Sequence, residues 1–177
     1  MKYLIVSDIH GAYDSTKFIL NVFEEEACDK ILLLGDVLYH GPRNDLPEYY
    51  LPKKVISLLN PYKDKIICVK GNCEAEVDQM VLDFKILDSY DDILNGIHVH
   101  LEHGHHLDLY HGDAKLVLYG HTHIPDNSQD ERGFQKINPG SITIPKNNSK
   151  RGYAIWDNNT ITLYSKDKDV ISTYTYK

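Results

Sequence analysis

The chain has 177 residues, of which 42% are hydrophobic and 25% are charged, and its formal net charge is −7. This length and composition predict one globular domain over residues 1–177 with a sizeable core. Because no apolar run reaches about 18 residues and no basic patch stands out, we expect neither a membrane span nor an extended nucleic-acid-binding surface.

The first half of the chain alternates short apolar runs with amphipathic segments, a pattern typical of parallel strands joined by helices. Strands are expected at Lys2–Asp8, Lys30–Asp36 and Asp64–Asn72. Helices are expected at Ser15–Ala27, with Ser15 as its N-cap, and at Leu51–Tyr62, where Pro61 ends the helix. We interpret the acidic residues Glu74, Glu76 and Asp78 as the solvated start of a further helix.

The second half is dominated by strand-like segments. They are Gly96–Gly104, Lys115–Gly120, Gly133–Ser141, Arg151–Asp157, Asn159–Ser165 and Asp169–Tyr176, with a tight hairpin expected around Asn158. We therefore predict an α/β fold with two stacked mixed β-sheets flanked by helices.

The start of the chain lacks the long apolar region and the cleavage site of a signal peptide, so a cytoplasmic location is expected. The three cysteines are an odd number and form no C-x-x-C motif, which argues against a disulfide framework and against a structural zinc knuckle. Cys28 and Cys68 are interpreted as small apolar core residues. The thirteen tyrosines would suit a surface that self-associates, so a homo-oligomer is an open expectation.

Polar side chains follow five of the predicted strands, at the end where open α/β sheets bind ligands. They lie in the segments SDIHG, LGDV, KGNC, LEHGH and YGHTH. The candidate ligands are Asp8, His10, Asp36, Asn72, His103, His121 and His123. Any one of these motifs is weak alone, but five in order are a strong signal.

Seven donors are too many for one zinc ion, which uses three or four ligands, and they suit two metals that share a bridging ligand. Mixed oxygen and imidazole donors favour manganese, with zinc, iron or nickel as alternatives, over calcium or magnesium. The cofactor prediction is therefore two divalent cations, with Mn²⁺ preferred.

In the order DIH, GD, GN, HGH and GHTH, the chain resembles the calcineurin-like metallophosphoesterase superfamily. Its segments GDVLYHGPRN, GNCEAEVDQM and INPGSITIPK are similar to those of the YfcE-type phosphodiesterases within it. The resemblance extends from Met1 to about Pro145 and implies the four-layer αββα sandwich of that superfamily.

The resemblance also implies roles for the candidate ligands. Asp8, His10 and His123 would hold one metal, Asn72, His103 and His121 the other, and Asp36 would bridge them. It implies hydrolysis of a small phosphodiester by hydroxide held between the metals, with Asp36, Asn72 and His103 as catalytic residues.

Two positions depart from the superfamily pattern. Cys73 stands where many members carry a histidine that protonates the leaving group, so esters with good leaving groups should react best. Tyr39 and His40 stand where protein phosphatases have aspartate and arginine, which argues against phosphoprotein substrates. Arg43 could still reach the substrate, although a solvated loop arginine is the simpler interpretation.

Cys73, His105 and Arg43 are the candidates for substrate contact, and His105 could equally support a ligand from behind. The histidines 98, 100, 106 and 111 are interpreted as strand, surface or turn residues. The alternative functions are a non-catalytic scaffold of the same fold and a phosphomonoesterase. The physiological substrate and the native metal are not predicted.

Overall fold

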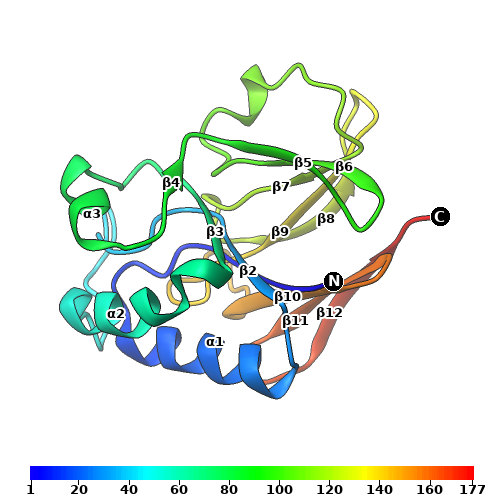
Figure 1. Cartoon of the computed structure of the whole chain (residues 1–177). Coiled ribbons are helices and arrows are strands. Elements are labelled where there is room, and N and C mark those ends of the chain that lie inside the picture. The colour runs from blue at the N-terminus through cyan, green and yellow to red at the C-terminus, as the bar shows by residue number, and fades with distance from the viewer.

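The computed structural model describes all residues, 1–177, and contains two β-sheets stacked face to face (Figure 1). The seven-stranded sheet has the order β12-β11-β10-β1-β2-β3-β4, and the five-stranded sheet has the order β5-β6-β7-β9-β8. Each sheet mixes parallel and antiparallel pairs, so the predicted pair of mixed sheets is confirmed.

The first sheet is built from strands at both ends of the chain. Its members are β1 (Lys2–Val6), β2 (Lys30–Leu33), β3 (Ile66–Val69), β4 (Ile86–Leu87), β10 (Gly152–Asp157), β11 (Thr160–Ser165) and β12 (Val170–Thr175). The helices of the chain are α1 (Tyr13–Glu25), α2 (Pro52–Leu59) and α3 (Glu76–Val81), with 3₁₀ segments η1 (Asn60–Lys65) and η2 (Leu107–Leu109). None of the helices combines the length and the apolar character needed to cross a membrane.

The second sheet comes from the middle of the chain. Its members are β5 (Tyr90–Leu94), β6 (Ile97–Leu101), β7 (Leu116–Leu118), β8 (Pro125–Gln129) and β9 (Gln135–Pro139). Its outer face is covered by the segment that contains η2, where the Tyr110 ring stacks on the His100 ring at a centroid distance of 4.1 Å.

Strand alternation divides the apolar residues between two cores. In β1, Leu4 and Val6 face α1 and belong to the core between helices and sheet, whereas Tyr3 and Ile5 belong to the core between the two sheets. Because both faces of this strand are covered, its sequence is a nearly continuous apolar run, as is typical of strands buried on both sides.

Several predicted boundaries were wrong. Helix α1 begins at Tyr13, and Ser15 is not its N-cap, because the buried Ser15 hydroxyl donates to the carbonyl of Ile142 instead. The second helix ends at Leu59 and continues as a 3₁₀ turn that contains Pro61.

Strands β4, β5 and β8 were not predicted. Strand β8 is polar throughout and is held by antiparallel pairing with β9, which hydrophobic periodicity does not detect. The interpretation of Asp78 as a solvated residue was also wrong, since this buried carboxylate accepts a hydrogen bond from the backbone of Ala75.

Candidate metal centre

The seven candidate ligands meet where the ends of five strands converge, three from the first sheet and two from the second. Asp8 and His10 follow β1, Asp36 follows β2, and Asn72 follows β3. From the other sheet, His103 follows β6, and His121 and His123 follow β7.

One group of donors consists of Asp8, His10 and His123, all of which are buried. The Nε2 atoms of His10 and His123 are 3.2 Å apart. The Oδ1 atom of Asp8 lies 3.2 Å from Nε2 of His123 and 3.7 Å from Nε2 of His10. Three donor atoms therefore face one small volume.

The second group consists of Asn72, His103 and His121. Oδ1 of Asn72 lies 3.1 Å from Nε2 of His103 and 2.7 Å from Nδ1 of His121. Asp36 lies between the two groups, since its Oδ2 is 3.4 Å from Nε2 of His103 and 3.7 Å from Nε2 of His10. The side chains thus gather in the two groups that the family resemblance implies, with Asp36 central.

Three of the histidines are oriented from behind by backbone carbonyls. Nδ1 of His10 is 2.7 Å from the carbonyl of Tyr39, Nδ1 of His103 is 2.6 Å from that of Leu34, and Nδ1 of His123 is 2.6 Å from that of Ile144. A carbonyl only accepts hydrogen bonds, so each Nδ1 carries the proton and donates it. In the neutral form of each ring, the Nε2 lone pair is then directed at the cluster, the arrangement of a metal-binding histidine.

The residues present fit divalent cations. Asp8 Oδ1 is buried without a hydrogen-bond partner, which is costly for a carboxylate oxygen unless a cation satisfies it. The facing Nε2 atoms of His10 and His123 cannot hydrogen-bond while both present lone pairs. Carboxylate, amide and imidazole donors together are typical of transition-metal sites.

The charges of the cluster shift its protonation equilibria. Burial opposes ionisation of Asp8, but the adjacent imidazoles of His10 and His123 outweigh burial and hold the pKa of Asp8 well below its usual range. Burial also opposes the charged form of His103, yet the contact with Asp36 and the charge of Asp8 raise its pKa to about 9. Both carboxylates are therefore ionised at neutral pH, as cation binding requires.

Five of the seven candidate ligands have a left-handed backbone. They are Asp8 (φ 57°), His10 (φ 49°), Asp36 (φ 54°), His121 (φ 66°) and His123 (φ 61°). Residues other than glycine seldom adopt this region, although Asp and His do so more often than most, and clusters of such residues occur at functional sites.

Two glycines permit the close approach of the strand ends. A Cβ at Gly71 would lie 2.1 Å from Asp36 Oδ1, and a Cβ at Gly120 would lie 1.8 Å from the hydroxyl of Ser7. Gly120 follows β7 of one sheet and Ser7 follows β1 of the other, so the second contact is the point at which the two sheet edges meet.

Glu74 supports the centre in a way that the sequence did not indicate. Its carboxylate accepts hydrogen bonds from the backbone N–H groups of Asp36, Val37 and Gly71. The interpretation of Glu74 as part of a solvated helix start was therefore wrong, because it ties the loop after β2 to the loop after β3. An acidic residue two positions after GN is the only sequence signal that could have suggested this.

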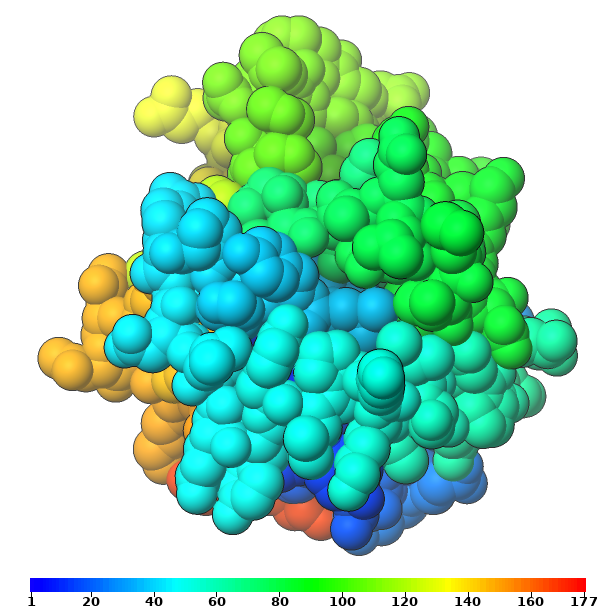
Figure 2. Space-filling model, turned by 90° about the vertical axis from the view of Figure 1, so that its left-hand side faces the viewer, coloured from blue at the N-terminus to red at the C-terminus, as the bar shows by residue number.

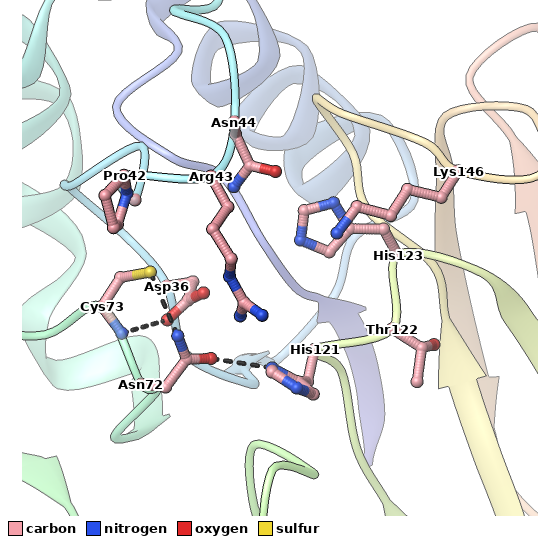
Figure 3. A pocket seen from close by; sticks show the side chains of 11 residues that line it. Asp36, Pro42, Arg43, Asn44, Asn72, Cys73, His121, Thr122, His123 and Lys146 are labelled. Carbon is pink, nitrogen blue, oxygen red and sulfur yellow. Dashed lines mark hydrogen bonds between the residues drawn. The ribbon is translucent and has the colours of Figure 1, made fainter.

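A cavity of about 250 Å³ opens beside the centre (Figure 3). Its lining includes Asp36, Asn72, His121 and His123 from the cluster, and also Arg43, Cys73 and Lys146. Lys146, the last residue of the segment INPGSITIPK, lies on a surface loop and was not predicted as a site residue.

The candidates for substrate contact differ in position. Arg43 is exposed, as expected of a loop arginine, yet its side chain is directed into the cavity between Asp36 and His121 (Figure 3). Cys73 lines the same cavity, and burial together with the charge of Asp36 raises the pKa of its thiol to about 12. His105 is exposed and lines a neighbouring hollow, with its ring centroid 5.5 Å from that of His103.

The histidines interpreted as non-ligands lie outside the cluster. His98 and His100 are on β6 and contact Asp91 of β5, at 3.7 Å and 2.9 Å respectively. His106 and His111 are exposed.

Comparison with known proteins agrees with this geometry. The family model for the calcineurin-like phosphoesterase superfamily domain matches residues 1–160. Phosphodiesterase YfcE of Escherichia coli (strain K12) is 40% identical over 97% of this chain and 96% of its own length. The solved structure of the E. coli phosphoesterase Yfce aligns with a TM-score of 0.94 at 37% identity, covering 99% of each chain.

More distant relatives share the fold. The probable metallophosphoesterase YsnB of Bacillus subtilis (strain 168) is 29% identical over 88% of this chain and 83% of its own. Zinc-complexed Vps29 of Entamoeba histolytica aligns with a TM-score of 0.64 at 18% identity over 99% of both chains, a likeness of fold alone. From the family match and the near full-length identity to YfcE, the chain belongs to the calcineurin-like phosphoesterase superfamily.

Proposed function

We propose that this protein is a phosphodiesterase that binds two divalent cations and hydrolyses a small phosphodiester. The identity of 40% to phosphodiesterase YfcE supports the reaction class. The single observation that carries the proposal is the convergence of seven donor side chains at two adjoining sheet edges, with Asp36 between the two groups.

In this proposal Asp8, His10 and His123 bind one cation, Asn72, His103 and His121 bind the other, and Asp36 contacts both. Bound there, the cations would supply an acidified water as nucleophile and neutralise charge on the phosphoryl oxygens. We expect Mn²⁺ to serve best, with Zn²⁺, Fe²⁺ or Ni²⁺ as substitutes, because the donors mix oxygen and nitrogen.

The polar residues of the cavity would orient the phosphoryl group. The Nδ2 group of Asn72 has only the weak acceptor Cys73 Sγ as a partner, at 3.4 Å, so it is available to donate to a phosphoryl oxygen. Arg43 would add a positive charge where negative charge develops in the transition state. His105, beside His103, would contact the part of the substrate that extends into the neighbouring hollow.

Two alternatives have distinct signatures. A scaffold would not need all seven donors, whose retention favours the enzyme. A phosphomonoesterase would hydrolyse p-nitrophenyl phosphate faster than bis(p-nitrophenyl) phosphate, whereas we expect the reverse order.

The test is hydrolysis of bis(p-nitrophenyl) phosphate after chelation and reloading with Mn²⁺. We expect about two metals per chain by elemental analysis and a loss of kcat/KM of at least about a hundredfold in Asp36→Asn, which keeps the size of the side chain but removes the central charge. Asp45→Asn, an exposed change in the loop after β2, is the matched control and should behave as wild type. No turnover of any diester by metal-loaded protein would refute the proposal.

A further inference from the structure

The cavity beside the centre holds two basic side chains without an acidic partner. Arg43 forms no ion pair, although each of the other two arginines pairs with an aspartate. Lys146 also lacks an ion pair, and both residues line the same cavity. In a chain whose net charge is −7, unpaired cations gathered in one cavity indicate an anionic ligand.

Arg43 stands on a constrained turn. The N–H of Asn44 donates to the carbonyl of Gly41 at 3.4 Å, and the Asn44 side chain donates to the carbonyl of His40 at 2.8 Å. Pro42 occupies the second position of this turn, where its fixed φ is favourable. The turn therefore fixes the backbone from which the Arg43 side chain enters the cavity, and no carboxylate pairs with its guanidinium group.

Lys146 approaches from the opposite wall. Its backbone N–H donates to the carbonyl of His123 at 3.3 Å, and its carbonyl accepts from the Ser149 hydroxyl at 2.7 Å. Figure 3 shows its side chain reaching the cavity from the His123 side, and Figure 2 shows the segments around residues 43 (light blue) and 146 (orange) on one face. Because only the backbone of Lys146 is engaged, its ammonium group is free to bind a ligand.

The other hollow beside the centre has the opposite character. It is lined by Asp88 and Glu102 together with histidines, and one oxygen of Glu102 is buried without a hydrogen-bond partner. An anionic substituent would be repelled there and attracted on the Lys146 side. The cavity that contains Lys146 has a single hydrophobic lining residue, so it suits a charged or polar terminal group.

We propose that Lys146 determines substrate specificity by binding a second anionic group, a phosphate or a carboxylate, carried by the phosphodiester. The scissile phosphoryl group of a diester bears one negative charge, which Arg43 and Asn72 already face, so the Lys146 ammonium group is left for another charge. This inference rests on the proposed phosphodiesterase function and narrows its substrate class to small phosphodiesters with an additional anion.

The test uses p-nitrophenyl phosphodiesters that differ only in the second ester group. That group is a phenyl ring with a 4-carboxylate, a 4-phosphate or a neutral 4-carboxamide, and p-nitrophenolate release gives kcat/KM. We expect wild type to prefer at least one anionic ester over the carboxamide by about fivefold, the size of a partly exposed ion pair. The carboxylate and phosphate arms then distinguish the two anions.

In Lys146→Gln the ratio of anionic to neutral kcat/KM should fall to about one. Lys150→Gln is the matched control, since it removes a lysine of the same loop that pairs with Asp169 at 2.7 Å and does not line the cavity. It should keep the wild-type ratio. Absence of a preference in wild type, or its survival in Lys146→Gln, would overturn the inference.

A binding measurement separates this inference from the proposed function. The matching 4-carboxyphenyl and 4-carboxamidophenyl phosphonates are titrated calorimetrically into Mn²⁺-loaded wild type and Lys146→Gln. If no diester is turned over, the phosphodiesterase proposal fails, yet a Lys146-dependent preference for the carboxylate still supports the anion site. Equal affinities in wild type would refute the anion site regardless of turnover.

Discussion

Several candidate ligands are held in place by groups behind them. Carbonyls hold Nδ1 of three histidines, and the Glu74 carboxylate gathers three backbone N–H groups from the loops that carry Asp36 and Asn72. Such supporting contacts fix the ligand geometry before a cation arrives. We therefore expect the affinity for metal to be sensitive to residues that never touch it.

Cys73 provides a test of leaving-group chemistry. Because burial and the charge of Asp36 raise its pKa to about 12, the thiol is a poor proton donor to a leaving alcohol. Wild-type kcat/KM should therefore fall steeply as the leaving-group pKa rises from p-nitrophenyl to alkyl esters. Cys73→Ala should remain within about threefold of wild type along that series, since it removes no general acid.

Cys73→His serves as the comparison for that series. It places an imidazole in the cavity and should improve alkyl esters more than p-nitrophenyl esters. A selective loss on alkyl esters in Cys73→Ala would show instead that the thiol donates a proton.

At the scale of elements, the sequence predicted the strands that are apolar runs and the donor positions that follow from the order of the motifs. Four of the five strands that carry the seven donors are short apolar runs, and the donors follow within a few residues, so their convergence could be expected. Strands β5 and β8 could not be predicted in this way, because their residues are mostly polar or exposed. They form by antiparallel pairing with β6 and β9, respectively. The roles of Lys146 and Glu74 could not be predicted either, because they depend on which loops lie next to each other in the folded chain.

The hairpin of β5 and β6 contains a pH-dependent contact. Asp91 lies opposite His100 in the register, and Nδ1 of His100 is 2.9 Å from the Asp91 carboxylate. Burial lowers the pKa of His100, but contacts with Glu102 and Asp91 raise this pKa by more than burial lowers it. The pKa of His100 in the folded protein therefore lies above 6.5. The stabilisation is therefore fully present below pH 6.5 and is lost as pH rises through the folded-state pKa.

We accordingly expect His100→Gln to lower the free energy of unfolding more at pH 5.5 than at pH 9, by about 1 kcal/mol. Urea unfolding of chelator-treated protein at both pH values measures the difference. His111→Gln, at an exposed position, is the control and should show no such dependence. An equal cost at both pH values would contradict this account of the hairpin.

At the scale of the whole molecule, the centre joins two sheets that also share a hydrophobic core between their facing sides. The donors after β1, β2 and β3 belong to one sheet and those after β6 and β7 to the other, so cations bound between them would cross-link the layers. Self-association and the extent of the domain stay predictions of the sequence.

Binding of Mn²⁺ should therefore raise the thermal unfolding temperature. Each cation bound at a free concentration a hundred times its Kd adds about 2.7 kcal/mol to the folded state, which corresponds to several degrees for a chain of this size. Differential scanning calorimetry of chelated and Mn²⁺-loaded protein measures the shift. Asp36→Asn should show a much smaller shift, and an identical shift in both proteins would place the bound cations elsewhere.

The left-handed conformation of five candidate ligands limits how stable this molecule can become. At about 1 kcal/mol for each residue, the five together hold about 5 kcal/mol of backbone strain, comparable with the whole net stability of a modest domain. Glycine at these positions would relieve the backbone strain and raise the unfolding temperature, but it would remove the donor side chains. Without bound cations, the thermal tolerance of the protein must therefore come from the distant parts of its two sheets.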